Sequence, residues 1–235
     1  MAELTEWFYQ VGETLLGLQS FPVMVIYLIL VALSPFYQRI TKPYSLRQTM
    51  VVYNFTCSFI SACTMFGAVA GMIAAGSIFQ KESNDLLKNS FFLYWCSKHL
   101  ELLDTLFMIL RHRSRQISFL HVYHHASMVL LSDYGYHHFP TPGVAFGLSI
   151  NAFVHVCLYF YYGYTAQRPL GSGAPSWKRH LTEIQITQFV VDLVHAVIGY
   201  LFHGFCVYCL MYGATMLYLF SSFYYHAYVR KRKGE

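Results

Sequence analysis

Charged residues are scarce in this chain: Asp, Glu, Lys and Arg make up only 11% of its 235 residues, whereas 56% are hydrophobic. An average soluble domain carries about a quarter charged residues, so the composition excludes an ordinary soluble domain. The first twenty residues hold three glutamates and no Lys or Arg, which argues against a cleavable signal peptide and suits a short interfacial helix. No cysteine falls in a predicted loop, so the six cysteines are interpreted as small apolar packing residues rather than a disulfide framework.

Apolar stretches long enough to cross a bilayer, which takes roughly 17 to 25 residues per helix, recur along the whole chain. They lie at residues 21–38, 50–76, 89–110, 117–136, 143–165, 181–203 and 205–229. The expected fold is therefore an all-α integral membrane protein, a bundle of seven transmembrane helices that forms a single membrane domain over residues 1–235. Only His203, Gly204 and Phe205 are available for the turn between the last two spans.

Lys and Arg alternate between successive predicted loops. One face of the bundle holds 13 of the 16, the other holds two, and Lys98 lies within a span. Because short cytosolic loops retain basic residues, we expect a lumenal N-terminus and a cytosolic C-terminus, which requires an odd number of spans. The tail "KRKGE" has lysines at 231 and 233 and is similar to a dilysine retrieval signal of the endoplasmic reticulum, although a positive-inside anchor explains it equally well.

Four predicted spans each carry polar side chains on one face. A charge in the hydrocarbon core costs at least about 2.5 kcal/mol on insertion scales, so such residues normally face the bundle interior. At about 100° per residue, Lys98, Glu101 and Asp104 cover an arc of about 120°, and opposite charges at this spacing partly neutralise each other. The groups on the next three spans are His121, His124 and His125; Asn151, His155 and Tyr162; and Thr182, Gln185, Gln188 and Asp192.

The depth of these groups predicts a polar pocket that opens to the cytosol. The histidines of "HVYHH" begin about four residues inside the cytosolic end of their span, and Thr182 lies at a similar depth. The lumenal halves of the same spans are mostly aliphatic and aromatic, which suits a closed substrate tunnel for an alkyl chain. Interhelical hydrogen bonding alone is the simpler alternative, but three histidines beside a charged row favour a functional site.

Two other classes of membrane protein share part of this pattern. Di-iron desaturases and hydroxylases use several "HxxHH" boxes, but the nine remaining histidines of this chain form no second box, so no metal site is expected. A seven-span receptor of the rhodopsin type, which is not an enzyme, would carry "DRY" and "NPxxY" elements. Both are absent, and its ligand would enter from the side opposite to the predicted pocket.

Four motifs, "KHLELLDT", "HVYHH", "NAFVHVCLYFYY" and "TEIQITQF", resemble in order and spacing the signature boxes of the very-long-chain fatty acid elongase (ELO) family. The resemblance implies an acyltransferase of the endoplasmic reticulum membrane, a 3-ketoacyl-CoA synthase that condenses a long-chain acyl-CoA with malonyl-CoA and releases CoA and CO2. It implies no bound cofactor, with malonyl-CoA as co-substrate. The implied partners are the 3-ketoacyl-CoA reductase, 3-hydroxyacyl-CoA dehydratase and enoyl-CoA reductase of the same cycle, with a homo-oligomer as an option and no nucleic acid.

By the same resemblance, His124 is the nucleophile that accepts the acyl group, and His155 is the histidine that faces it. His121 and His125 complete the catalytic set. The residues implied to hold substrate or CoA are Lys98, Arg111, Arg113, Gln116, His121, Asn151, Tyr161, Lys178, Thr182 and Gln185, and the structural polar row is Glu101, Asp104 and Gln188. The chemistry agrees, because neutral imidazole attacks thioesters and covalent catalysis divides the condensation into two easier steps. His155 or His121 could orient His124, act as a base or donate to the developing enolate oxygen.

The choice of acyl chain rests on a narrower resemblance. "HVYHHASM" is similar to the form found in elongases of polyunsaturated substrates, whereas "LLSDYGYHH" departs from the tryptophan-rich run of animal elongases. We therefore expect a polyunsaturated acyl chain, with chain length set by the depth of the tunnel near the lumenal ends of the spans.

Overall fold

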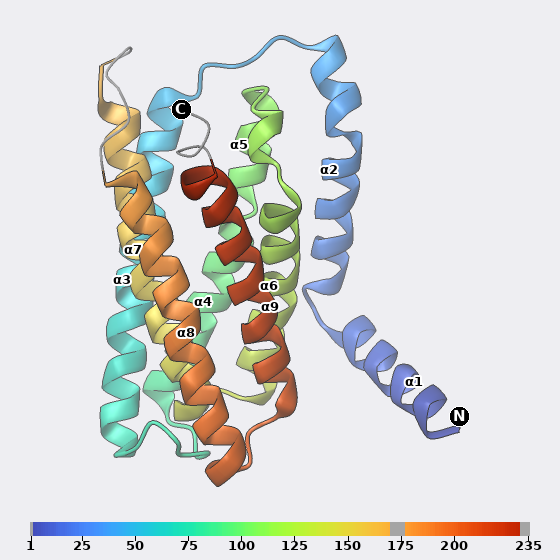
Figure 1. Cartoon of the computed structure of the whole chain (residues 1–235), viewed down its shortest axis with the longest axis vertical. Helices are drawn as coiled ribbons and strands as arrows, with labels where there is room; N and C mark the ends of the chain where they lie inside the picture. The colour runs from blue at the N-terminus through green and yellow to red at the C-terminus, as the bar shows by residue number, and fades with distance from the viewer. Residues whose placement is uncertain (1, 170–176, 231–235) are drawn as a thin grey trace. The chain divides into compact units, whose positions relative to one another are not determined.

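The computed structural model describes residues 2–169 and 177–230, and every regular element in those two ranges is a helix (Figure 1). In chain order the elements are α1 (Ala2–Gly17), α2 (Phe21–Ile40), α3 (Arg47–Ala75), α4 (Asp85–Leu100), α5 (Leu103–Leu110), the 3₁₀ turn η1 (Ser114–Gln116), α6 (Phe119–His138), α7 (Pro142–Gln167), α8 (Lys178–His203), α9 (Val207–Tyr224) and the π-helical turn η2 (Tyr225–Val229). The chain divides into two compact units. The first comprises residues 1–46 and 95–139, and the second comprises residues 47–94 and 140–235.

In the first unit, α2 packs against α5 and α6. The helix α6 begins where Ser118 caps it, because the Ser118 hydroxyl oxygen accepts a hydrogen bond from the backbone N–H of His121 at 3.2 Å. The start of α2 is joined to the far end of α6, since the backbone N–H of Ser20 donates to Oδ2 of the fully buried Asp133 at 2.5 Å. These two contacts set where each helix begins and how α2 lies along α6.

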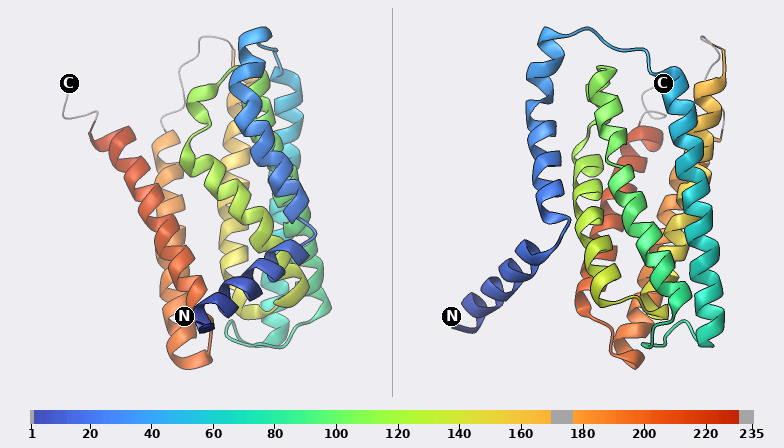
Figure 2. Two further views of the ribbon diagram at one scale, coloured as in Figure 1. Left: turned by 90° about the vertical axis from the view of Figure 1, so that its right-hand side faces the viewer. Right: turned by 180° about the vertical axis from the view of Figure 1, so that it is seen from behind.

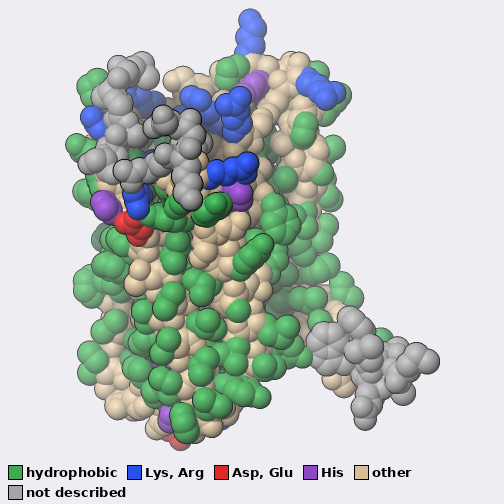
Figure 3. Space-filling view, in the orientation of Figure 1, with side chains coloured by type: hydrophobic (Ala, Val, Ile, Leu, Met, Phe, Trp, Pro, Cys, Tyr) green, Lys and Arg blue, Asp and Glu red, His purple; other side chains and the backbone are tan. Residues whose placement is uncertain are grey.

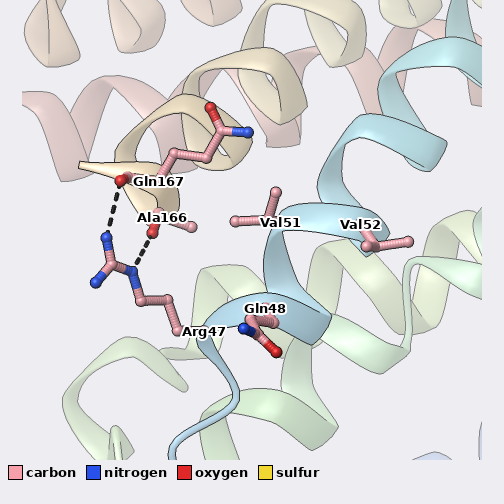
Figure 4. A pocket seen from close by; sticks show the side chains of 6 residues that line it. All are labelled: Arg47, Gln48, Val51, Val52, Ala166 and Gln167. Atoms are coloured by element: carbon pink, nitrogen blue, oxygen red, sulfur yellow. Dashed lines mark hydrogen bonds between the residues drawn. The ribbon is translucent and has the colours of Figure 1, made fainter. Parts of the chain in front are cut away.

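In the second unit, α3 lies along α7 and α8 lies along α9, as the two views of Figure 2 show. Arg47, the first residue of α3, donates from Nε to the carbonyl of Ala166 and from Nη2 to the carbonyl of Gln167, each at 2.8 Å (Figure 4). The last carbonyls of a helix have no partner within the helix, so this guanidinium satisfies the end of α7 and aligns it with the start of α3. Beside it lies a pocket of about 450 Å³ lined also by Gln48, Val51 and Val52.

The turn between α8 and α9 packs around the ring of Phe205. Gly204 adopts the left-handed conformation at φ 66°, which glycine tolerates without strain, and α8 ends there. The next backbone N–H, that of Phe205, donates to the carbonyl of Gly199 at 3.0 Å. The Phe205 ring then fills the space that a Cβ would need at Gly143 and at Gly199. The turn comprises residues 204–206, one residue later than the predicted 203–205, because His203 still belongs to α8.

Four of the described helices, α2, α3, α7 and α8, are long and apolar enough to cross a membrane. Their outer faces expose large apolar side chains, among them Phe66 at 67% and Val194 at 54%, which suits contact with lipid. On the face shown in Figure 3, hydrophobic side chains cover the middle of α8 and α9, and charged side chains gather where α8 begins. The prediction of an all-α membrane protein is confirmed, while the count of seven spans stays a prediction.

The predicted span at residues 89–110 is not one continuous helix, because α4 ends at Leu100 and α5 begins at Leu103. Across this break the backbone N–H of Leu102 donates to the carbonyl of His99, and that of Asp104 donates to the carbonyl of Glu101. Both bonds are tighter i to i−3 contacts, typical of a 3₁₀ turn. Hydrophobic periodicity does not reveal such a local change, because the leucines Leu100, Leu102 and Leu103 continue through it.

Candidate functional site

The three histidines of "HVYHH" form one group of imidazole rings on α6. The ring centroids of His121 and His125 are 4.3 Å apart, and those of His124 and His125 are 5.5 Å apart with nearly perpendicular planes. His125 is buried, while His121 and His124 are half-buried. The group therefore has one ring inside the packing and two that a substrate could reach.

His121 is fixed by a hydrogen-bonded chain that crosses three helices. Its Nε2 lies 2.7 Å from the hydroxyl oxygen of Thr105 on α5, and that oxygen lies 3.1 Å from the hydroxyl of Tyr27 on α2. Thr105 is 1% exposed and Tyr27 is 5% exposed, so water does not compete for these bonds. The ring of His121 is thus held in one orientation beside His125.

A buried ion pair lies next to the histidine group. Lys98 Nζ is 2.9 Å from Oε1 and 3.0 Å from Oε2 of Glu101, and each side chain is 2% exposed. The pair is close enough for both charges to act on the ring of His125. The predicted polar row is interrupted here, because Asp104 belongs to α5 beyond the break, is half-buried and contributes its charge near the start of that helix.

The connection from α5 to α6 carries three of the residues predicted to bind CoA. Arg111 is half-buried at the end of α5, and Arg113 and Gln116 are exposed. Partial burial, together with the neighbouring Arg113, lowers the pKa of the Arg111 guanidinium from its ordinary value. Two positive groups in this position favour an anionic ligand such as phosphate.

The end of α2 holds this connection in shape. His112 has φ 55°, an uncommon conformation for a residue with a side chain, and its Nε2 lies 3.1 Å from the Thr41 hydroxyl. Gln38 donates from Nε2 to the carbonyl of Ile109 at 3.1 Å and accepts a hydrogen bond from the Ser114 hydroxyl. Sequence reasoning missed these residues, because nothing in a helical pattern marks a contact 71 residues away.

The second unit carries the remaining predicted residues. On α7, Asn151 accepts a hydrogen bond from the Tyr94 hydroxyl at 2.8 Å, and His155 is buried with its ring 5.7 Å from that of Tyr159. Tyr161 is buried, with its ring edge-on to Trp177 at 4.9 Å.

On α8 the residues of the predicted polar face differ in burial. Thr182 and Gln188 are buried and Gln185 is half-buried, while Lys178 at the start of the helix is exposed. Gln188 donates from Nε2 to Oδ2 of Asp192 at 3.2 Å. These residues share one side of the helix, as their spacing predicts.

A three-residue contact between α8 and α9 was not predicted. The Tyr224 hydroxyl donates to Oε1 of Glu183 at 2.7 Å and accepts from Arg179, whose Nε also lies 2.8 Å from the same carboxylate oxygen. We call this group the α8–α9 clasp. It holds the first turn of α8, which carries Lys178 and Thr182, against the last turn of α9.

The predicted site residues thus fall into two sets. The first unit brings together the histidines of α6 and the Lys98–Glu101 pair, and the second places Asn151 and His155 on α7. The expected facing of His124 and His155 joins residues of different units and stays a prediction. Thr105 could have been proposed from the sequence, since it ends the "KHLELLDT" motif. Tyr27 could not, because it lies 78 residues from Thr105 and belongs to no motif. Within residues 2–169 and 177–230, no three or more His, Cys, Asp or Glu side chains gather as metal ligands would.

Comparison with known proteins places the chain in a family. The ELO family, described as the GNS1/SUR4 family, matches residues 18–235. Very long chain fatty acid elongase 5 of Tachysurus fulvidraco is 32% identical over 222 residues, which cover 89% of this chain and 74% of that protein. Very long chain fatty acid elongase 5 of Homo sapiens is 32% identical over 230 residues, covering 90% and 75%. Very long chain fatty acid elongase 4 of Homo sapiens is 32% identical over 226 residues, covering 90% and 71%. The matched range includes both units, the four apolar helices and all four motifs, and this integral membrane protein therefore belongs to the GNS1/SUR4 (ELO) family.

Proposed function

We propose that this chain is the condensing enzyme of fatty acid elongation, a 3-ketoacyl-CoA synthase that lengthens a long-chain acyl-CoA by two carbons from malonyl-CoA. The family and the names of the relatives support the elongation of fatty acids. The observation that carries the chemistry is the imidazole group of α6, with its half-buried His124 next to the buried Lys98–Glu101 pair.

In the first step, a ring nitrogen of His124 attacks the thioester carbonyl of the acyl-CoA. The carbon–sulfur bond breaks, CoA leaves as the thiolate and takes up the imidazole proton, and an acyl-imidazole forms. His124 suits this role because it is half-buried and therefore reachable, whereas His125 is enclosed behind it. His121, fixed by Thr105, orients the neighbouring rings and shapes the position of the attacked carbonyl.

In the second step, malonyl-CoA loses CO2 and its α-carbon attacks the acyl-imidazole carbonyl. The carbon–nitrogen bond breaks, the departing imidazolate takes up one proton from solvent and returns to neutral imidazole, and 3-ketoacyl-CoA is released. That proton is the one consumed over the cycle, because the imidazole proton lost in the first step leaves on CoA. We assign His155 and Asn151 to the enolate oxygen, since a buried imidazole held beside a hydrogen-bonded amide offers a preorganised donor.

The phosphates of CoA are assigned to the basic residues outside the helices' apolar middle. Arg111 and Arg113 lie on the connection held by α2, and Lys178 is exposed at the start of α8. Gln116, Tyr161, Thr182 and Gln185 complete this set. Guanidinium groups bind phosphate in a fork geometry, which favours the two arginines for the most negative part of CoA.

We further propose seven spans, with α4 and α5 together forming the third, a lumenal N-terminus, a cytosolic C-terminus and residence in the endoplasmic reticulum. The uneven distribution of Lys and Arg supports the orientation. The tail "KRKGE" lies outside the described residues, so its role as a retrieval signal is a sequence-based proposal. The reductases and the dehydratase of the elongation cycle are the proposed partners, and no bound cofactor is needed for the steps above.

The decisive experiment is to trap the acyl-enzyme. Purified protein is incubated with an acyl-CoA but without malonyl-CoA, and its intact mass is measured. We expect a gain of one acyl group on the peptide that contains His124, abolished by His124→Ala. The matched control is His138→Ala, an exposed histidine at the end of the same helix, which should keep both the adduct and the incorporation of labelled malonyl-CoA. An adduct that persists in the His124→Ala protein would exclude this nucleophile.

Substrate choice is tested separately. The segment "HVYHHASM" supports a polyunsaturated acyl chain, so a panel of acyl-CoA substrates matched in length should show the highest kcat/KM for polyunsaturated members. Preference for saturated chains would overturn that part of the proposal and leave the condensing reaction in place.

A further inference from the structure

Two cysteines lie together where α9 begins. Cys206 is the residue that caps α9, and Cys209 is the third residue of the helix, within the motif "FCVYC". Both are exposed free thiols, whereas Cys57 is buried. The interpretation of all cysteines as packing residues inside spans is wrong for this pair, because Cys206 precedes the helix and neither side chain is enclosed.

The backbone brings the two side chains to the same place. Cys206 has the extended conformation of a capping residue, with φ −74° and ψ 137°, and its carbonyl accepts a hydrogen bond from the backbone N–H of Cys209 at 3.2 Å. The two cysteines occupy the capping position and the third helical position, the same two positions that a capping box links through side-chain to backbone hydrogen bonds.

We infer that Cys206 and Cys209 form a redox-active dithiol that closes to an intramolecular disulfide at the start of α9. This inference goes beyond the proposed condensing reaction and does not use its residues. The oxidant that reacts with the pair is a disulfide, either of a small molecule or of a redox protein. The inference rests on the spacing of the pair in the first turn, on its exposure and on the fixed turn that precedes it.

The preceding turn is fixed independently of the cysteines. Gly204 supplies the left-handed bend, and the half-buried Phe205 ring packs against Gly143 and Gly199. Cys206 therefore cannot swing away from the helix start without unpacking that ring. A pair held in register in this way forms a disulfide with little change of the backbone.

The exchange balances with a small disulfide as the oxidant. The Cys206 thiolate attacks one sulfur of the disulfide, the sulfur–sulfur bond breaks, and one thiolate leaves. Cys209 then loses its proton and attacks the Cys206 sulfur, which releases the second thiolate and completes the new bond. The pair gives up two electrons and two protons, and the oxidant becomes two thiols. Cys206 is the first nucleophile because it is exposed at the N–H-rich start of a helix, which attracts negative charge.

The compartment follows from the proposed orientation. If the N-terminus is lumenal and seven spans are present, the turn between α8 and α9 faces the lumen, where disulfides form and persist. The lumenal placement rests on the proposed topology, whereas the chemistry of the pair does not.

The test is differential thiol labelling of the full-length purified protein. The protein is equilibrated with oxidised glutathione, its free thiols are blocked with N-ethylmaleimide, and after reduction the new thiols are labelled with iodoacetamide. We expect Cys206 and Cys209 to carry the second label. Cys63 and Cys96, which are exposed but have no neighbouring cysteine in sequence, serve as controls that should carry the first label.

Two variants identify the pair. Cys209→Ser should stop the exchange at the mixed disulfide, so that Cys206 gains the mass of one glutathione. Cys206→Ser should leave Cys209 with the first label. Retention of the first label by both cysteines after oxidation would overturn the inference, and so would an unchanged labelling pattern in Cys209→Ser.

A last arm separates this inference from the proposed function. The double variant Cys206→Ser/Cys209→Ser should keep the acyl adduct at His124, because the pair lies outside the condensing machinery. If the unmodified protein forms no acyl adduct, the proposed condensing reaction is contradicted. The inference about the cysteines is unaffected, because thiol labelling does not depend on enzyme activity. A pair that oxidises in the purified protein but is fully reduced in sealed microsomes would overturn only its lumenal placement.

Discussion

At the scale of single residues, Thr105 connects a candidate catalytic ring to the rest of the first unit. Its hydroxyl contacts both His121 and Tyr27, and the three side chains come from three different helices. Removing that hydroxyl leaves two polar partners at a buried position, which is costlier than losing a bond to solvent.

We predict that Thr105→Val lowers stability by about 1–3 kcal/mol and slows formation of the acyl-enzyme, because His121 loses its anchor. Tyr27→Phe is the matched control: it removes only the outer bond of the chain and should cost about 0.5–1.5 kcal/mol with a smaller effect on acylation. Thermal unfolding and single-turnover acylation measure the two quantities. Equal acylation rates in Thr105→Val and the unmodified protein would show that His121 needs no such support.

The buried pair Lys98–Glu101 gives a second prediction at this scale. Lys98→Met should destabilise the protein by about 3–5 kcal/mol, because it leaves an uncompensated buried carboxylate. The double variant Lys98→Met/Glu101→Leu should recover much of that loss in thermal unfolding while staying inactive. If the double variant is as unstable as the single one, the two charges do not interact as a pair.

At the scale of elements, the α8–α9 clasp fixes the beginning of one helix to the end of another. Tyr224→Phe removes the hydroxyl that contacts both Arg179 and Glu183 but keeps the ring. We predict faster hydrogen exchange confined to the first turns of α8, and a higher KM for malonyl-CoA because Lys178 and Thr182 lie in those turns. Unchanged exchange there would mean that packing alone holds the two helix ends.

Close packing of α3 against α4 gives another prediction. A Cβ at Gly71 would lie 2.7 Å from the Leu87 side chain and 3.1 Å from its backbone nitrogen, so Gly71→Ala should destabilise the protein by about 1–3 kcal/mol. Gly12→Ala in α1 has nothing within 4 Å and should be neutral or slightly stabilising, since alanine favours helix. Equal thermal stability of the two variants would contradict the close contact.

At the scale of the whole molecule, orientation can be tested with the chain intact. In sealed microsomes, a tag at the N-terminus should resist protease and a tag at the C-terminus should be removed. Tags on the same side would require an even number of spans, and the reverse pattern would invert the predicted pocket opening.

How far sequence reasoning reached depends on the range of each contact. The bounds of α7 and α8 were predicted within three residues, because Pro142 and Gly204 mark helix ends by local chemistry. The break after Leu100 was missed, because Leu100, Leu102 and Leu103 run through the 3₁₀ turn and nothing in the spacing marks it. The spacing correctly predicted that the histidines of α6 share one face. It could not predict the hydrogen bonds to Thr105 and Tyr27 that hold His121, because these residues lie on other helices.

The contact between Arg47 and the end of α7 has a consequence for the time course of synthesis. The two partners are separated by 119 residues, so at about 5–20 residues per second the start of α3 is made several seconds before its partner emerges from the ribosome. During that interval α3 must remain in the bilayer without α7. The helix α3 is long and apolar enough to span a membrane by itself. It can therefore remain inserted as an independent helix until the carbonyls that Arg47 binds have been synthesised.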